Sequence, residues 1–378
     1  MPDRFLHIVA FDIPYPPNYG GVIDVFYKIK TLHEAGIRLI LHIFEYPGRE
    51  RRPELENYCE QIYYYPRLTN LRSALMPQPY IVASRRSDKL LERLSADDYP
   101  VLFEGLHSSY YLGHPALKEK LAVLRSANIE HHYYFSLFRA ESNPLNKLYF
   151  LSASLKLRLF QSMARHAGLI AAISEADTKY LSEKFPGNRV EFIPAFHENN
   201  EVVSLPGKGK YILYHGNIEV PENTRAALFL AEKVFGNSGI PFVIAGMKPP
   251  PKILRLAEKY PNIRVIPNPE TDQMKELVRE AHVNVLVTFQ PTGLKLKLLN
   301  CLYQGRYCLV NQQMLNGTGL DPVCHIANDA ESLRVIAHKL FDSEFTEAEI
   351  DRRKELLMQK FDNRAVGDKL IRAIWGTN

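Results

Sequence analysis

The chain has 378 residues, which exceeds the size that one hydrophobic core usually supports, so two domains are expected. Hydrophobic residues make up 46% and charged residues 24% of the sequence, which excludes a disordered or low-complexity chain. The formal charge of +5 suits an anionic small ligand, an anionic membrane surface or nucleic acid, and it does not distinguish among them.

The cysteines and the amino terminus indicate the compartment. The four cysteines have neither the paired spacing of a zinc site nor the density of a disulfide scaffold, so reduced thiols are expected. The amino terminus lacks the basic segment and long apolar run of a signal peptide, and no apolar run approaches the roughly 20 residues of a membrane span. We therefore expect a cytoplasmic protein.

The chain opens with a βαβ pattern. Residues 6–11 form an apolar run of strand type, residues 14–21 (PYPPNYGG) form a loop, and apolar residues at helical spacing lead to a second strand at 38–44. Gly20 and Gly21 let a ligand approach the backbone closely, because they lack a Cβ and adopt positive φ at little cost. The spacing is not the dinucleotide fingerprint G-x-G-x-x-G, and an ordinary turn before a helix is the alternative.

A basic stretch with interleaved apolar side chains follows at residues 67–93. Such a region can rest on an anionic membrane surface, where basic side chains meet the lipid headgroups. The alternative is a solvated helical face. Nucleic acid is not expected as a partner, because the basic residues are scattered and no motif combines aromatic and basic residues for base recognition.

Two further strand ends carry groups that can exchange protons. Residues 101–104 predict a short strand, and His107 lies just beyond it. Residues 125–130 (RSANIE) form a second such place, which ends at Glu130 and is followed by HHYYF. A histidine at a strand end can take or give a proton near neutral pH, whereas a buried, hydrogen-bonded histidine is the alternative.

The first half ends at a polar linker. Residues 145–165 predict one long helix, residues 169–173 a strand, and Ser174 is a good N-cap for the helix that follows. Residues 190–193 predict the last strand of this half, and the segment 194–210 is rich in proline, glycine and polar residues, as expected for a domain boundary.

The second half repeats the alternation of strands and helices. Its expected elements are a strand at 211–214, a loop at 215–224, a helix at 225–234, a strand at 242–245 that ends in Gly246, a strand at 263–266, a helix at 272–281 and a helical pattern at 347–375. Both halves thus predict an α/β fold with two doubly wound parallel sheets that face each other across a cleft.

The segment 284–311 (NVLVTFQPTGLKLKLLNCLYQGRYCLVN) predicts a strand, a loop and a helix. A helix that begins at the carboxyl end of a parallel strand offers backbone N–H groups and a partial positive charge to a ligand. Lys295 and Lys297 add two amines near that helix start, so an anion such as a phosphate is the expected ligand. The alternative is that both lysines lie on a solvated helix face.

Six segments, in this order and at this spacing, resemble a GT-B-fold glycosyltransferase of the family 4 type: PYPPNYGG, NIEHHYYF, AISEADTKYL, YHGNIEVPENTRAALFL, VIAGMKPPP and GLKLKLLNCLYQGRYCLV. The resemblance extends over nearly the whole chain. It implies an acceptor-side Rossmann-like domain at 1–195, a nucleotide-sugar-binding Rossmann-like domain at 208–361, and a terminal helix at 362–378 that packs back on the first domain. It also implies catalysis without a metal ion or other cofactor and with retention at the anomeric carbon.

The resemblance assigns roles to individual residues. Those placed at the donor are Gly20, Gly21, Gly216, Asn217, Gly246, Asn268, Thr292, Gly293, Leu294 and Asn300. Those placed at the reacting groups are His107, Glu130, Lys295 and Lys297.

The sequence departs from the family pattern at two places. Asn217 and Glu222 stand where the family often has an arginine and a lysine that clamp the diphosphate, so Lys295 and Lys297 would have to neutralise the phosphates. Thr292 and Asn300 stand where the family has paired glutamates, the second of which binds the ribose hydroxyls. A neutral amide in place of a carboxylate weakens donor binding by about 1–2 kcal/mol.

We interpret the sequence as a glycosyltransferase that moves a hexose from a donor such as UDP- or GDP-hexose to a saccharide or lipid-linked saccharide, in polysaccharide biosynthesis. Peripheral contact with the anionic inner membrane face is part of this interpretation. A non-catalytic relative that binds a sugar nucleotide or a glycan is the first alternative. A sugar-nucleotide epimerase on the same fold is the second, and it would convert the donor without an acceptor.

Overall fold

The computed structural model describes residues 4–46, 48–141, 143–289 and 296–376. The strands of the first half are β1 (Phe5–Ala10), β2 (Arg38–Glu45), β3 (Gln61–Pro66), β4 (Val101–Glu104), β5 (Ala122–Ser126), β6 (Leu169–Ala172) and β7 (Arg189–Phe192). Those of the second half are β8 (Ile212–Asn217), β9 (Phe242–Met247), β10 (Ile263–Pro267), β11 (Val283–Leu286), β12 (Tyr307–Val310) and β13 (His325–Ile326).

Helices connect these strands. The α-helices of the first half are α1 (Gly20–Glu34), α2 (Leu71–Leu75), α3 (Tyr80–Ala83), α4 (Asp88–Leu94), α5 (Glu130–Ala140), α6 (Pro144–Phe160) and α7 (Glu175–Lys184). Those of the second half are α8 (Pro221–Phe229), α9 (Pro251–Leu254), α10 (Leu256–Lys259), α11 (Thr271–Glu280), α12 (Leu296–Gln304), α13 (Gln312–Leu315), α14 (Ala330–Asp342), α15 (Glu347–Phe361) and α16 (Asn363–Trp375).

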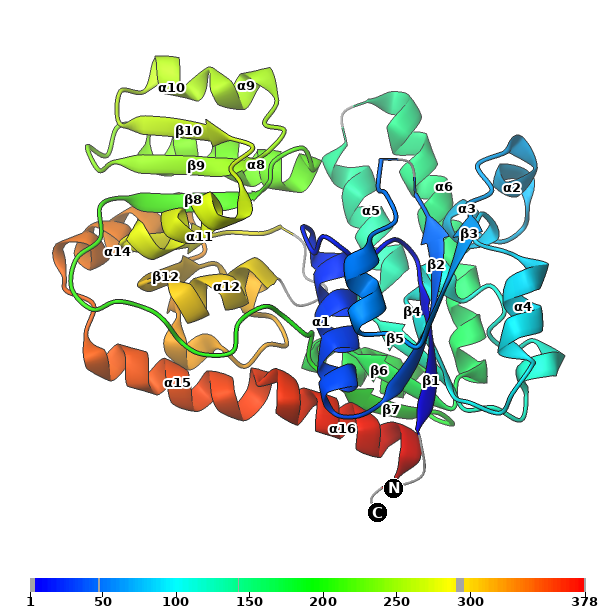
Figure 1. The fold of residues 1–378 in the computed structure, drawn as a ribbon. Coiled ribbons are helices and arrows are strands. Elements are labelled where there is room, and N and C mark those ends of the chain that lie inside the picture. Colours follow the sequence, from blue (N-terminus) through cyan, green and yellow to red (C-terminus); the bar gives the residue numbers. More distant parts are fainter. Residues whose placement is uncertain (1–3, 47, 142, 290–295, 377–378) are drawn as a thin grey trace.

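Each half builds its own parallel sheet. The strand order is β3-β2-β1-β4-β5-β6-β7 in the first sheet and β10-β9-β8-β11-β12-β13 in the second, and all pairs are parallel. Figure 1 shows the two sheets side by side, with helices around each. The predicted α/β architecture with two doubly wound sheets is therefore confirmed.

The apolar sequence of β1 follows from its burial on both faces. Leu6, Ile8 and Ala10 pack in the core that α1 and α16 cover, whereas Val9 packs in the core on the opposite face. Because successive side chains of a strand point to opposite faces, a central strand with helices on both sides needs apolar residues throughout. The polar exception, His7, is bonded through Nδ1 to Nε2 of His42 at 2.8 Å.

Strand order fixes where a ligand can bind. In the first sheet the neighbours of β1 are β2 and β4, and in the second sheet the neighbours of β8 are β9 and β11. The chain therefore leaves each central strand in opposite directions, which opens a crevice at the carboxyl ends of these strands. The segments that follow β1 and β8 reach this crevice.

The helical pattern at 347–375 consists of two helices, α15 and α16. Asp362 ends α15 and caps α16, because its side chain accepts a hydrogen bond from the Ala365 N–H at 2.8 Å. Figure 1 shows α15 beneath the second domain and α16 beneath the first. Gly367 lets α16 lie close to α1, since a Cβ there would meet the Thr31 side chain at 2.7 Å.

The linker and the two terminal helices meet at His197. Its ring Nε2 bonds the Phe361 carbonyl at 2.8 Å, and its backbone exchanges two hydrogen bonds with the Asn363 side chain. The chain thus passes between the domains twice at one place, and the buried imidazole ties the two crossings together.

Three other sequence predictions need correction. The region 215–224 is not a single loop, because His215 to Asn217 complete β8 and Pro221 starts α8 at the first helical position, where its missing N–H is harmless. The helix predicted at 225–234 is α8 followed by a π-helical segment at Leu230–Phe235. The predicted helix at 145–165 ends as α6 at Phe160 and continues as a 3-10 helix.

Candidate ligand-binding site

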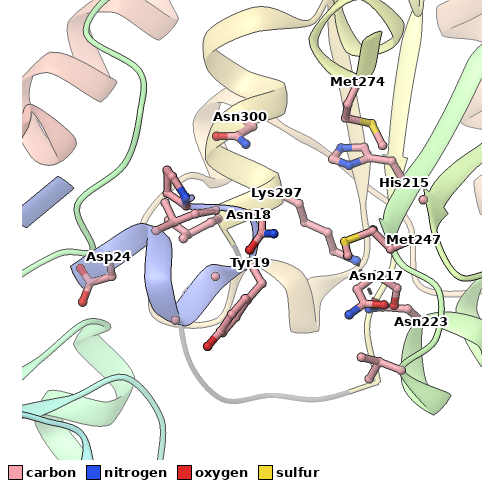
Figure 2. A pocket seen from close by; sticks show the side chains of 18 of the residues that line it. Asn18, Tyr19, Asp24, His215, Asn217, Asn223, Met247, Met274, Lys297 and Asn300 are labelled. Atoms are coloured by element: carbon pink, nitrogen blue, oxygen red, sulfur yellow. Dashed lines mark hydrogen bonds between the residues drawn. The ribbon is translucent and has the colours of Figure 1, made fainter. Parts of the chain in front are cut away.

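A cavity of about 520 Å³ lies between the two domains at the carboxyl ends of the central strands. Its size falls in the range that holds a small molecule or cofactor. The first domain contributes the start of α1 and part of α5, and the second contributes the ends of β8 and β9 and the start of α12. Figure 2 shows Asn18 and Tyr19 on one side of the cavity and Lys297, Asn217 and Asn223 on the other.

Two helix starts approach each other across the cavity. A Cβ on Gly20, the first residue of α1, would lie 3.9 Å from Cδ1 of Leu296, the first described residue of α12. The N-cap of α1, Tyr19, makes no side-chain capping bond, and its hydroxyl instead donates to Asp12 at 2.6 Å. Neither helix has an acidic residue in its first turn. Both ends therefore favour an anion.

Gly21 of α1 serves packing rather than an unusual backbone conformation. Neither Gly20 nor Gly21 has positive φ, so the expectation that these glycines serve to allow positive φ is wrong. A Cβ on Gly21 would come within 2.8 Å of the Phe11 ring. Glycine at this position thus lets the first turn of α1 lie against that ring at the mouth of the cavity.

Lys297 is held at the cavity by partners from β8 and α8. Its Nζ donates to Oδ1 of Asn223 at 3.3 Å and lies 5.2 Å from the ring centre of Tyr214. The Asn223 amide in turn donates to the Asn217 carbonyl at 2.8 Å. Figure 2 shows the Lys297 side chain extending from α12 towards these asparagines. The amine is thereby positioned at the end of β8, where a ligand in the crevice would meet it.

The described lining is not cationic, because it carries three carboxylates and two amines. Its charged side chains are Asp24, Glu198, Glu222, Lys275 and Lys297. Lys275 pairs with Glu198 at 2.8 Å, so these two charges largely cancel. Lys297 contributes the second amine of the described lining.

The side chain of Glu222, on α8, reaches the segment just after β11. Its carboxylate accepts a hydrogen bond from the Thr288 hydroxyl and lies 3.3 Å from the Phe289 N–H. A carboxylate at this place repels a phosphate, and it stands where the resemblance leads one to expect a cation. Glu222 thus gives this wall a negative charge where the resemblance implies a positive one.

Asp24, on the first-domain wall, belongs to a buried ionic cluster. Arg125 donates to both of its oxygens, at 3.1 and 3.0 Å, and Lys28 donates to it at 3.2 Å and to Glu104 at 2.6 Å. Burial opposes ionisation, but Arg125 and Lys28 hold the pKa of the Asp24 carboxyl below its usual value. Asp24 also accepts from the Phe196 N–H at 2.8 Å, so the cluster fixes α1 to the linker.

Asn300 contacts the linker as well as the cavity. Its Oδ1 accepts from the Asn199 amide at 2.9 Å, and the Asn199 Oδ1 accepts from Gln304 at 2.7 Å. Asn300 and Gln304 both line the cavity from α12. In this arrangement the oxygen of Asn300 already has a donor, so its amide N–H groups are the part best placed for a ligand oxygen.

The remaining predicted donor residues of the second domain lie at the ends of β8, β9 and β10. Gly216 and Gly246 line the cavity and lie so close together that a Cβ on Gly246 would collide with the Gly216 carbonyl. Asn268 has φ of 50°, and its Oδ1 accepts from the Lys248 N–H at 2.7 Å. It is not among the residues that line the cavity, although the next residue, Pro269, is.

His107 and Glu130 lie behind the first-domain wall and are not lining residues. Their nearest atoms, Nδ1 and Oε1, are 3.9 Å apart. Burial, reinforced by the cations Arg85 and Arg67, lowers the pKa of His107 to about 3. Burial, with a smaller contribution from Asp177, raises the pKa of Glu130 to about 8. At neutral pH both groups are therefore uncharged, and Glu130 carries a proton that it can donate.

Four predicted residues lie outside the described part of the chain. These are Thr292, Gly293, Leu294 and Lys295. Their assigned roles at the donor remain predictions.

Sequence reasoning missed several residues that line the cavity. Asn223 sits on α8, which begins four residues earlier than predicted, and Glu198 comes from the linker, which was assigned no binding role. Tyr133 follows the HH pair on α5 and also reaches the cavity. The motif segments contain Asn223 and Tyr133, so their presence beside the glycines was the available signal.

The described residues contain no group of three or more His, Cys, Asp or Glu side chains placed to hold a metal ion. Within the same part of the chain, no helix has the length and apolar character needed to cross a membrane.

Comparison with known proteins gives one sequence relative and several structural ones. No family model matches the chain. An "uncharacterized 44.6 kDa protein in cps region" from Klebsiella pneumoniae is 23% identical over 331 residues, which cover 82% of this chain and 84% of that protein. Sucrose-phosphate synthase from Thermosynechococcus elongatus superposes with a TM-score of 0.69 at 13% identity over 98% of each chain.

Two further structures were solved with nucleotide ligands. Anabaena HepE, in complex with UDP and glucose, has a TM-score of 0.62 at 10% identity and covers 99% of this chain and 100% of its own. Medicago truncatula UGT71G1, complexed with UDP-glucose, has a TM-score of 0.57 at 11% identity over 98% of each chain. The chain has the GT-B fold. The resemblance seen in the sequence motifs is thereby confirmed for the whole architecture, both domains included.

Proposed function

We propose that this protein is a glycosyltransferase that moves a hexose from a nucleotide sugar to a saccharide or lipid-linked saccharide, in polysaccharide biosynthesis. The observation that carries the proposal is the interdomain cavity, in which the starts of α1 and α12 approach each other and Lys297 extends inward. A nucleoside diphosphate is the leaving group that such a site suits, because two helix starts and an amine stabilise its developing charge.

The proposed roles follow from position. Backbone N–H groups at Gly20 and Gly21 and the amine of Lys297, with Lys295, would hold the diphosphate. Gly216, Asn217, Gly246, Asn268, Thr292, Gly293, Leu294 and Asn300 would surround the rest of the donor. The acceptor hydroxyl can release its proton late, to the departing phosphate itself, so a dedicated base is not required.

His107 and Glu130 would act from behind the acceptor-side wall. Because Glu130 is buried and does not line the cavity, its role would be to position that wall rather than to contact the sugar. Retention at the anomeric carbon and independence from metal ions are further parts of the proposal, and they come from the resemblance of the sequence motifs to the family 4 type.

Enzymatic turnover tests this proposal. The protein is incubated with UDP- and GDP-linked hexoses, with and without saccharide and lipid-linked acceptors, and free UDP or GDP is measured. We expect release of one nucleotide that rises with a suitable acceptor and persists in EDTA. Absence of release from every donor, together with binding of a glycan, would contradict the enzyme assignment.

A second candidate is a non-catalytic relative that binds a sugar nucleotide or a glycan. Two observations favour it: Glu222 adds a negative charge at the end of β11, and the oxygen of Asn300 is bonded to the linker. Calorimetry separates the candidates, because a non-catalytic relative would bind a sugar nucleotide without consuming it. An epimerase would instead convert the donor when no acceptor is present.

A further inference from the structure

Helix α6 presents a row of leucines to solvent. Leu145, Leu148, Leu155 and Leu159 are 79%, 65%, 56% and 77% exposed, and the exposed Ser152 lies between the two pairs. These positions recur at intervals of three and four residues, so they form one straight stripe along the helix. Soluble proteins rarely expose such a continuous apolar surface unless it meets a partner.

The leucine row extends onto neighbouring elements. Leu75, at the end of α2, is 76% exposed, and the Lys156 Nζ of α6 donates to the carbonyl of the next residue, Met76, at 2.9 Å. Phe135 of α5 and Tyr149 of α6 are also exposed. Figure 1 shows α5 and α6 as a pair at the upper edge of the first domain, with α2 beside them.

The charges around this surface are mainly positive. Helix α6 carries Lys147, Lys156 and Arg158 and has no Asp or Glu over its 17 residues. Arg72 of α2 and Arg139 of α5 add further positive charges, and Glu141, just before α6, is a nearby carboxylate. A second copy docked through α6 would bring basic residues against basic residues in either orientation, and this repulsion disfavours a helix pair. An anionic surface with an apolar layer beneath it complements both the amines and the leucines.

We propose that the leucine row of α6 and the end of α2 dock on an anionic lipid bilayer. The leucines would enter the boundary between headgroups and acyl chains, and the basic residues would meet the headgroup phosphates. Helix α5 packs against α6 and carries Tyr133 at the cavity, so docking through α6 would place this wall of the cavity one helix layer from the bilayer. This proposal stands on the surface alone and does not require the proposed function.

Vesicle co-sedimentation of the full chain tests the docking. Vesicles of phosphatidylcholine alone are compared with vesicles that also contain phosphatidylglycerol. We expect binding to the anionic vesicles only, with loss of binding at high salt. The double variant Leu148→Ser/Leu155→Ser should reduce the partition coefficient by about ten-fold or more, because two inserted side chains lose their apolar contacts. Lys147→Gln/Arg158→Gln should reduce it by about five-fold per charge.

The matched control is Leu254→Ser/Val335→Ser, which changes two exposed apolar residues of the second domain. Its vesicle binding should equal that of the unchanged protein. Equal binding to both vesicle types, no binding to either, or an unaffected Leu148→Ser/Leu155→Ser variant would overturn the proposal. So would light scattering that reveals a dimer which this variant dissociates, because the row would then bind a second copy. Nucleotide binding, measured without vesicles, reports on the proposed function separately.

Discussion

The two walls of the cavity use their charges differently. On the first-domain wall, Asp24 is surrounded by Arg125 and Lys28 and also accepts a backbone bond from the linker. On the second-domain wall, Lys297 contacts a neutral amide of Asn223 and the ring of Tyr214. The charges of the first wall therefore hold α1 in place, whereas the second wall places the Lys297 amine at the cavity.

This difference separates stability from binding. Changes to the first wall should mainly alter the free energy of unfolding, and changes to the second should mainly alter ligand affinity. Four substitutions test this separation.

Asp24→Ala should have the largest effect. It leaves Arg125 and Lys28 buried with Glu104 as their remaining carboxylate, and loss of one partner from such a cluster costs about 3–5 kcal/mol. Denaturant unfolding measures this change. The control Asp351→Ala removes an exposed carboxylate that pairs with Lys354 and should cost less than about 1 kcal/mol. An equally small effect for Asp24→Ala would mean that the cluster does not hold the first wall.

Glu130→Gln should change how stability depends on pH. The ordinary pKa of a glutamate is 4.5, and that of buried Glu130 is raised to about 8. Between these values the folded state keeps a proton that the unfolded state loses, so this residue makes stability fall by about 1.4 kcal/mol per pH unit as pH rises.

Unfolding of wild type and variant at pH 5 and pH 8 checks this. The difference between their free energies of unfolding should shift by up to about 4 kcal/mol in favour of Glu130→Gln at the higher pH. Exposed Glu183 provides the control, because Glu183→Gln should follow the wild-type profile. Parallel profiles for Glu130→Gln would show that its carboxyl ionises normally.

Lys297→Ala should weaken binding of a nucleoside diphosphate by about ten-fold or more, because a charge-assisted hydrogen bond is lost. Isothermal titration calorimetry gives the dissociation constant. Lys248→Ala removes an exposed lysine whose partner is Glu219 and should leave affinity unchanged. Unchanged affinity in Lys297→Ala would remove this amine from the site.

Glu222→Gln should have the smallest effect and the opposite sign. The amide keeps an acceptor for the Thr288 hydroxyl but removes the negative charge, so a diphosphate should bind about three-fold more tightly. The same titration measures it. Weaker binding would indicate that the Glu222 carboxylate contacts a hydroxyl of the ligand instead of repelling its phosphates.

Much of the fold could be predicted because its signals are local. Continuous apolar runs such as β1 and β4 indicate strands buried on both faces, and Ser174 caps α7 as predicted, with its hydroxyl accepting from the Asp177 N–H at 3.0 Å. Periodicity alone did not reveal the break between α15 and α16, because a single Asp362 in a helical pattern gives a weak stop signal. The separate terminal helix at 362–378 came from the resemblance.

The site was less predictable because it depends on contacts between distant segments. Lys297 could be placed at a helix start, but its partners Asn223 and Tyr214 come from elements more than 70 residues away. The bond between Asn199 and Asn300 likewise joins the linker to α12. Periodicity and capping describe neighbours along the chain, so such pairs need the folded arrangement.

The central claim is that the cavity binds an anionic ligand through the phosphates of that ligand. The most direct test compares nucleoside diphosphates with their nucleosides on the unchanged protein. Titrations with UDP and GDP should reveal at least one that binds, and the matching nucleoside, uridine or guanosine, should bind at least about ten-fold more weakly. Equal affinity for the nucleoside and its diphosphate, or no binding of either diphosphate, would contradict the account.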